Sequence, residues 1–501
     1  MTERFAYDDV PYDTEANADT HPSSMATLAR LAGLVAAPPS VARVLEIGCG
    51  NGENLVAAAT YLPRTRFVGF DLAASAIEVG RASARTSGTD NVTLYSADIR
   101  DARTSGIANE APGSFDYVVA HGMCSWVPPD VRHDLLAVMH DALAPRGIGF
   151  VSVNALPGWE LRRALRELAL DRARSLDAPA SKVAEALSAI GEIARTGKDA
   201  SGFFGALSAA AREYLEHVER ATPPDAPFSR YVFHDLLADI NEPFSADALA
   251  SELARAGLRI VCETPLRPSR ASSSFEDLAN DLAKTGTPFL QVLVQRDDAP
   301  AARRVDAGAV IDLLLWADFA PVSTGTFRTT TGALVRPVGD DGLARATQRA
   351  PGFVRVCELA DDDARTALAR QLFAGFCEGV FTLVTEAPPA CTTDVGDRPQ
   401  VAEHVRIRAA VAVQARAPSA ILTSALHRSY RVPWSELVVV AQLDGAHTSA
   451  EIAEAVKREA SGVPSSIAGP LAGATDREVD RVVATVIDRI RRHLFLVEGP
   501  R

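Results

Sequence analysis

The sequence has few of the features that mark membrane-spanning, secreted or metal-binding proteins. None of its apolar runs reaches the ~20 residues that a membrane-spanning helix needs. Its first residues lack a basic region followed by an apolar stretch, so we expect no secretory signal. The six cysteines are scattered and include no Cys-x-x-Cys pair, which argues against a disulfide framework and a zinc site. We therefore expect a cytoplasmic protein without membrane insertion and without a metal.

Basic residues are outnumbered by acidic ones, 51 against 64, which gives a net charge of −13. Nucleic acids are bound mainly by clustered lysine and arginine, so we expect no nucleic-acid partner. Apolar residues make up 47% of the 501 residues, which is ample for packed cores. A chain of this length predicts two to four domains.

The most informative stretch is residues 44–71. It opens with a short apolar run, which predicts a strand buried on both faces. Glycines follow at positions 48, 50 and 52, where they permit positive φ and a close approach of the backbone to a ligand. The residues from Asn54 onward predict a helix, so a ligand can lie against backbone N–H groups at a helix start.

A carboxylate ends the next predicted strand, residues 66–70. Asp71 lies 19 positions after Gly52, where a carboxylate can accept hydrogen bonds from both hydroxyls of a ribose. The ligand predicted by this crossover is a nucleoside.

The spacing of the glycines favours one class of nucleoside. A dinucleotide fingerprint, Gly-x-Gly-x-x-Gly, would need a glycine where this chain has Glu53, and a pyrophosphate would meet that carboxylate. An oxidoreductase that binds NAD is therefore the disfavoured alternative. The acid-x-Gly-x-Gly-x-Gly pattern resembles the loop of class I S-adenosylmethionine (SAM) methyltransferases, in which the loop holds the methionine end of the cofactor. The cofactor contacts expected from this stretch are Glu46, Gly48, Cys49, Gly50, Gly52, Asn54, Asp71 and Leu72.

Three more predicted strands, residues 91–97, 115–120 and 148–153, alternate with helices, as in a doubly wound sheet. A turn is expected at residues 145–147, before the last of them. The resemblance implies that Asp98 accepts from the exocyclic amine of adenine and that Ile99 lies against the ring. The alternative role for Asp98 is to cap the following turn.

The strand at 115–120 ends at His121, and the resemblance implies that this strand end faces the sulfonium. DNA amino-methyltransferases carry Asp/Asn-Pro-Pro-aromatic here, whereas this chain has His-Gly-Met-Cys, so a DNA base is disfavoured as acceptor. His121 is therefore a candidate for cofactor binding and, as the base that deprotonates an acceptor, for catalysis. Trp126 and Tyr12 are further candidates for the acceptor site. The alternatives are a structural hydrogen bond for His121 and core packing for Trp126.

Tyr7, Tyr12 and His21 precede the first strand. They predict either a lid over the site or an ordinary helix start with aromatic packing.

Several longer motifs narrow the resemblance as far as about residue 296. They are Tyr-Asp-x-Val-Pro-Tyr from position 7, Ser-Trp-Val-Pro-Pro from 125, Asn-Ala-Leu-Pro-Gly-Trp from 154 and His-Asp-Leu-Leu from 234. Together they resemble bacterial methyltransferases with a methyltransferase regulatory domain, a group that includes protein-lysine methyltransferases acting on outer-membrane proteins. The function implied is SAM-dependent methylation of a protein side chain, with lysine favoured and S-adenosylhomocysteine as product. The alternatives are a small-molecule methyltransferase and a SAM-binding regulatory protein without transferase activity.

The fold expected is α/β, with a Rossmann-like, doubly wound, seven-stranded methyltransferase sheet. Residues 1–156 form the SAM-binding domain, and residues 245–297, with apolar runs at 258–262 and 289–294, complete its sheet. Residues 157–244 show helical spacing without strand signal, which predicts an inserted helical regulatory module. A homodimer through this module is one expectation. Residues 298–399 are a mixed middle domain, and the mainly helical residues 400–501 resemble a winged-helix domain. A DNA-reading role for that last domain is disfavoured because acidic residues dilute the charge of its helices.

Overall fold

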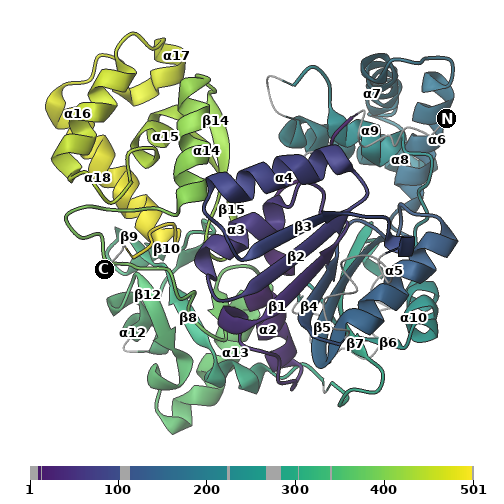
Figure 1. Ribbon diagram of the computed structural model, residues 1–501, viewed down its shortest axis with the longest axis horizontal. Helices are drawn as coiled ribbons and strands as arrows, with labels where there is room; N and C mark the ends of the chain where they lie inside the picture. Colours follow the sequence, from purple (N-terminus) through teal and green to yellow (C-terminus); the bar gives the residue numbers. More distant parts are fainter. Residues whose placement is uncertain are drawn as a thin grey trace.

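The computed structural model describes residues 10–12, 14–101, 113–222, 226–266, 284–302, 304–338 and 341–498. The candidate lid residue Tyr7 lies outside these ranges. Figure 1 shows a central twisted sheet, with a group of helices at the upper right and the C-terminal helices at the upper left. Among the described helices, none is long and apolar enough to span a bilayer.

The central sheet has the strand order β3-β2-β1-β4-β5-β7-β6. β7 runs antiparallel to its neighbours β5 and β6, and the other described pairs are parallel. This arrangement confirms the predicted seven-stranded, Rossmann-like sheet. Its strands are β1 (Arg43–Ile47), β2 (Arg66–Asp71), β3 (Val92–Ser96), β4 (Phe115–Ala120), β5 (Leu143–Asn154), β6 (Leu258–Glu263) and β7 (Phe289–Arg296).

The sheet is buried on both faces because its central strands are apolar at successive positions. Val44 packs into the core on one face and Leu45 into the core on the other, and each is at most 1% exposed. Residues of α2, α3 and α4 contribute to the first core, and residues of α5 and α10 to the second. These helices are α2 (Pro22–Leu31), α3 (Glu53–Tyr61), α4 (Ala74–Thr86), α5 (Pro129–Ala142) and α10 (Ala246–Arg255).

The turn predicted at residues 145–147 lies inside β5, so this prediction was wrong about where the strand begins. Leu143 already pairs with Phe115, whereas Ile148 pairs with Tyr117. The register therefore shifts between the two pairs, and the intervening proline, arginine and glycine form an irregularity that the sheet accommodates.

Between β5 and β6 the chain forms a separate group of helices, seen at the upper right of Figure 1. Leu165, Ile190 and Tyr214 belong to a core of this group's own, and each is at most 1% exposed. The helices are α6 (Glu160–Ala173), α7 (Pro179–Thr196), α8 (Gly202–Ala221) and α9 (Arg230–Leu236).

The segment after β7 packs against the sheet through the first core. Leu315 and Leu372 join the same buried cluster as Val44. Its main elements are η6 (Ala307–Asp312), β8 (Leu314–Ala317), β9 (Ala320–Ser323), β10 (Thr326–Arg328), β11 (Leu334–Val335), α12 (Gly342–Gln348), β12 (Gly352–Arg355), η7 (Val356–Glu358), α13 (Asp362–Cys377) and β13 (Thr382–Val384).

The last part of the chain has its own core, which also takes in Tyr61 of α3. Near the end of the chain, Leu496 forms an isolated bridge with Val401. The elements are α14 (Glu403–Gln414), β14 (Ser419–Thr423), β15 (Ser429–Pro433), α15 (Trp434–Val440), α16 (Ser449–Ala460), α17 (Ser465–Ala468), η8 (Gly469–Leu471) and α18 (Asp476–Arg492). The winged-helix assignment of this part stays a prediction.

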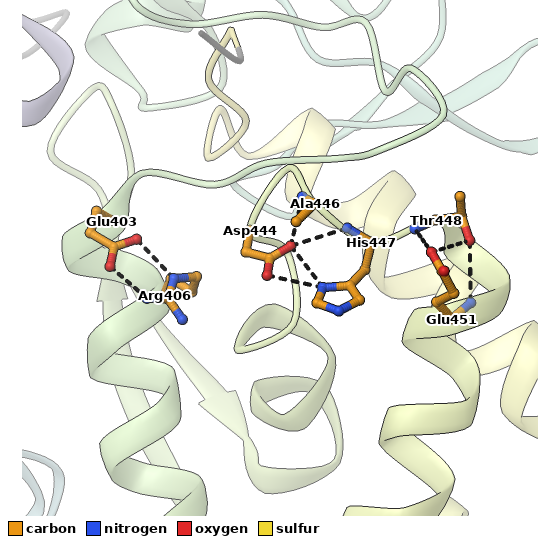
Figure 2. Close-up of polar contacts among 7 residues, drawn as sticks. All are labelled: Glu403, Arg406, Asp444, Ala446, His447, Thr448 and Glu451. Atoms are coloured by element: carbon orange, nitrogen blue, oxygen red, sulfur yellow. Dashed lines mark hydrogen bonds and ion pairs between the residues drawn. The ribbon is translucent and has the colours of Figure 1, made fainter.

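The loop between α15 and α16 carries Asp444 and His447, and Glu451 follows in the first turn of α16 (Figure 2). Asp444 accepts from the backbone N–H groups of Ala446 and His447 at 2.8 and 3.2 Å, and its carboxylate lies 3.0 Å from Nδ1 of His447. Thr448 and Glu451 form a capping box at the start of α16. These contacts shape a turn and a helix start, so this cluster, which we call the α16 cap cluster, has a structural role.

Candidate cofactor and acceptor site

The glycine turn has the conformation that its sequence predicts. Gly48, Gly50 and Gly52 have φ values of 71°, 55° and 69°. The backbone N–H of Gly48 donates to the carbonyl of Phe70 at 2.9 Å, which ties the turn to β2. A side chain at position 48 would collide with Met123, which follows β4. Glycine is therefore required here by both φ and space.

Asp71 holds the turn from the end of β2. Its Oδ2 accepts from the backbone N–H of Gly50 at 2.8 Å, and its Oδ1 accepts from that of Ala73 at 2.8 Å. These bonds place the carboxylate of Asp71 beside the glycine turn, at the end of β2, where the sequence predicts the ribose contact.

Glu46 is a buried carboxylate with incomplete bonding. Its side chain is 6% exposed, and its Oε1 accepts from Nδ2 of Asn54 at 3.1 Å. Its Oε2 is buried without a hydrogen-bond partner within the described part of the chain. Burial raises the pKa of Glu46 to about 8, although the bond from Asn54 works in the opposite direction. A cationic group beside Oε2 would satisfy this carboxylate, and the ammonium of SAM is such a group.

Four other predicted cofactor contacts lie in different settings. The thiol of Cys49 is buried beneath Gly69, and burial raises its pKa. Leu72 is 44% exposed, whereas Ile99 is 8% exposed and belongs to the core formed with α5. Asp98 Oδ1 accepts from the backbone N–H of Arg100 at 2.9 Å, which is the capping contact considered as the alternative for this residue. Its side chain also bonds the guanidinium of Arg100, which lowers the pKa of Asp98.

His121 lies at the end of β4 between two polar side chains. Its Nδ1 is 3.1 Å from Oγ of Ser152, and its Nε2 is 3.2 Å from Nδ2 of Asn17. Burial lowers the pKa of His121 to about 4, so the imidazole is neutral at pH 7. Because the amide of Asn17 donates, Nε2 is the acceptor and Nδ1 carries the proton.

The N-terminal segment and β7 supply residues that sequence reasoning missed. Nδ2 of Asn17 donates to Oε1 of Gln291 at 3.4 Å, and Nε2 of Gln291 donates to Oδ2 of Asp19 at 2.9 Å. Burial raises the pKa of the half-buried Asp19, although its hydrogen bonds from Gln291 and Thr264 oppose this. A signal for Gln291 was present, because it is a polar residue inside an otherwise apolar strand.

The candidate aromatic residues face the helical insertion. Trp126 packs edge-on against the buried Trp159, with ring centroids 6.4 Å apart. Tyr12 is 41% exposed and packs edge-on against His234 of α9 at 5.4 Å. His21 accepts from the backbone N–H of Ser23, so it caps α2, as in the helix-start interpretation.

Two residues of the C-terminal part reach the first turn of α3. Nε2 of His427 is 2.9 Å from Oδ1 of Asn54. Arg408 of α14 pairs with Glu53, the residue whose charge was expected to repel a pyrophosphate. The charge of Glu53 is therefore already offset by a distant residue.

Among the described residues, no group of three or more His, Cys, Asp or Glu side chains is placed to hold a metal ion.

Comparisons with known proteins agree with this geometry. Residues 44–147 match a family model described as a methyltransferase domain. The chain is 35% identical to the uncharacterised protein RP028 of Rickettsia prowazekii over 182 residues, which are 36% of this chain and 70% of that protein. It is 34% identical to the uncharacterised protein RP789 of the same organism over 179 residues, which are 36% of this chain and 31% of that protein.

A solved structure extends the likeness to nearly the whole chain. PKMT2 from Rickettsia typhi, in complex with S-adenosylhomocysteine, superposes with a TM-score of 0.80 at 21% identity, covering 97% of this chain and 100% of that one. The fold and the match to the methyltransferase model together define a class I SAM-dependent methyltransferase, with SAM as its cofactor. Within that class, the chain belongs to the same family as RP028.

Proposed function

We propose that this methyltransferase transfers the methyl group of SAM to a protein side chain, with lysine as the favoured acceptor. The observation that carries the proposal is the chain of hydrogen bonds from His121 through Asn17 and Gln291 to the carboxylate of Asp19. A lysine with a pKa of ~10.4 must lose its proton before it can accept a methyl group. A half-buried carboxylate, linked to the end of β4 through Gln291 and Asn17, suits an acceptor that arrives as a cation and leaves a proton behind.

The proposed division of roles follows the contacts of each residue. SAM supplies an activated methyl group, so the protein's task is alignment and desolvation. We assign the cofactor to Glu46, Gly48, Cys49, Gly50, Gly52, Asn54, Asp71, Leu72, Asp98, Ile99 and His121. Neutral His121 accepts from Asn17 at Nε2, which suits it to orient that amide in the site. Trp126 and Tyr12 would contact the acceptor from the side of the insertion.

Two further features bear on the acceptor and on assembly. The likeness to PKMT2 extends over the insertion and the C-terminal parts, which supports an acceptor larger than a metabolite.

At the start of α8 in the insertion, Phe203 and Phe204 are 68% and 39% exposed. These rings support a homodimer formed through residues 157–244. We also propose a cytoplasmic location, the lack of a nucleic-acid partner and the remaining domain assignments.

The test is to incubate the full chain with methyl-labelled SAM and a cell lysate, then to separate protein from small molecules. Label in protein, located by mass spectrometry on lysine side chains, is the expected result. Label confined to small molecules would favour the metabolite methyltransferase. Tight SAM binding without labelled product, with several lysates, would favour the regulatory alternative. The Asp19→Asn variant is the informative companion, because it should keep SAM affinity and lose most turnover.

A further inference from the structure

His427 has an unusual backbone conformation in a buried position. It lies in the turn between β14 and β15, with φ of 60°, and it is 1% exposed. Non-glycine residues rarely adopt this left-handed region, and they keep it where the surrounding contacts demand it. The backbone N–H of His427 closes the turn on Ser424 at 2.9 Å, its ring lies 4.8 Å from that of His21, and its Nε2 bonds Asn54, which lies 373 positions earlier in the chain.

That bond fixes a residue of the cofactor site. Oδ1 of Asn54 accepts from the imidazole of His427 and from the backbone N–H of Asn17 at 3.0 Å. Nδ2 of Asn54 donates to Glu46 at 3.1 Å and to Oγ1 of Thr20 at 3.0 Å. The amide thus uses two donor and two acceptor positions, which determines its orientation. Because Oδ1 can only accept, the neutral imidazole carries its proton on Nε2.

A second residue of the C-terminal part contacts Glu53, which directly precedes Asn54. Arg408 pairs with Glu53, so residues 53 and 54, directly after Gly52, are both held by residues beyond position 400. The two partners, Arg408 and His427, both lie outside the stretch that matches the methyltransferase model, residues 44–147.

We propose that His427 is a positioning residue of the cofactor site: it holds the amide of Asn54 toward one oxygen of Glu46 and thereby leaves the other oxygen for the ammonium of SAM. The C-terminal part of the chain completes the site in this way. Contacts that displace the turn between β14 and β15 therefore weaken SAM binding, and SAM binding stabilises the turn by the same factor. This inference rests on the proposed assignment of Glu46 and Asn54 to the cofactor.

The test uses the full-length chain and the His427→Gly variant. Glycine adopts a φ of 60° without strain, so this variant removes the imidazole while it keeps the backbone of the turn. By calorimetry, we expect SAM binding to be about tenfold weaker, because a buried polar group loses its partner. Added imidazole, which fits the space left by the side chain, should restore most of the affinity.

A second readout separates positioning from mere packing. SAM affinity should rise with pH as Glu46 ionises, and we call the midpoint of this rise the pH midpoint. The bond from Asn54 lowers the pKa of Glu46, so a loosened amide should move the pH midpoint upward in His427→Gly. The other ionisable groups around Glu46 are Asp71 and Cys49, and those around His427 are His21 and His404. None of these four is altered by the substitution. His493→Ala is the matched control, because His493 is a half-buried histidine of the same part of the chain that packs edge-on against Tyr430. It should keep the SAM affinity and the pH midpoint.

Each outcome decides the matter. A folded His427→Gly variant with unchanged affinity, or one with weaker binding, no rescue by imidazole and no shift of the midpoint, overturns the inference. Asn54→Ala tests its foundation separately. If Asn54→Ala binds SAM normally, the cofactor assignment fails, whereas loss of binding in Asn54→Ala with none in His427→Gly refutes the role of His427 alone.

Discussion

The α16 cap cluster and the cofactor site each combine a carboxylate with a histidine, and they differ in almost every other respect. In the α16 cap cluster (Figure 2), Asp444 and His447 are three residues apart, and their side chains are 29% and 48% exposed. In the cofactor site, Glu46 and His427 are joined through Asn54, and they are 6% and 1% exposed. The same residue types therefore form a turn in one place and line the proposed cofactor site in the other. What distinguishes them is burial and the distance along the chain between partners.

The pKa values of the two carboxylates move in opposite directions. Burial raises the pKa of Glu46 to about 8. Burial also acts on Asp444, but the donors of Ala446 and His447 outweigh it and lower the pKa of that carboxyl. Asp444 is therefore already satisfied as an anion, whereas Glu46 still lacks a cation. A buried acid with an unpaired oxygen is the stronger indication of a ligand.

The largest effect is expected from Glu46→Gln. Glutamine has nearly the same shape but cannot balance an ammonium, and losing one partner of a buried charge pair costs roughly 2–5 kcal/mol. SAM binding measured by calorimetry should weaken about 100-fold, at the lower part of that range. The matched substitution Asp444→Asn, in the α16 cap cluster, should leave SAM affinity unchanged. Equal losses in both variants would mean that burial and incomplete bonding do not identify the site.

The pH dependence of SAM binding should give the next largest effect. The ammonium is attracted by the ionised form of Glu46, so affinity should rise as pH rises toward the pKa of about 8. The limiting slope is about tenfold per pH unit, and the rise should end where the α-amino group itself loses its proton, at roughly pH 7.7–8.0. In Glu46→Gln this rise should disappear. A wild-type affinity that is flat from pH 6 to 7.5 would contradict the assignment.

A smaller effect is expected from His121→Ala, which tests a histidine that resembles His427 in its bonding to an asparagine. His121 is neutral because burial lowers its pKa to about 4. Turnover should fall about tenfold through loss of positioning, which is less than the roughly 10²–10⁴-fold that a general acid or base contributes. The pH–rate profile between pH 6 and 9 should keep its shape, because the lost group does not titrate there. Full turnover across this range would remove His121 from the mechanism.

How much of the site the sequence predicts depends on how far apart the partners are. The glycine turn, Asp71 and the strand order follow from local patterns, because strand periodicity and glycine spacing are read within about 30 residues. The bonds of Asn54 to His427 and of Asn17 to Gln291 join positions 373 and 274 residues apart, which no local pattern specifies. The left-handed conformation of His427 likewise has no signal, since the residue is not a glycine. The start of β5 was misplaced because Pro145 and Gly147 are typical of turns, yet here they lie in a register shift.

The smallest effect should come from Thr448→Ala in the α16 cap cluster. The hydroxyl of Thr448 and the carboxylate of Glu451 satisfy backbone donors reciprocally at the start of α16. Loss of such a cap costs about 1 kcal/mol. In a chain with several cores this cost should appear as faster amide exchange at the start of α16, by about fivefold, rather than in one global transition. Because the cap is local in sequence and exposed, SAM affinity should not change. A change in affinity would mean that α16 is coupled to the first turn of α3, and local satisfaction would then no longer separate the two clusters.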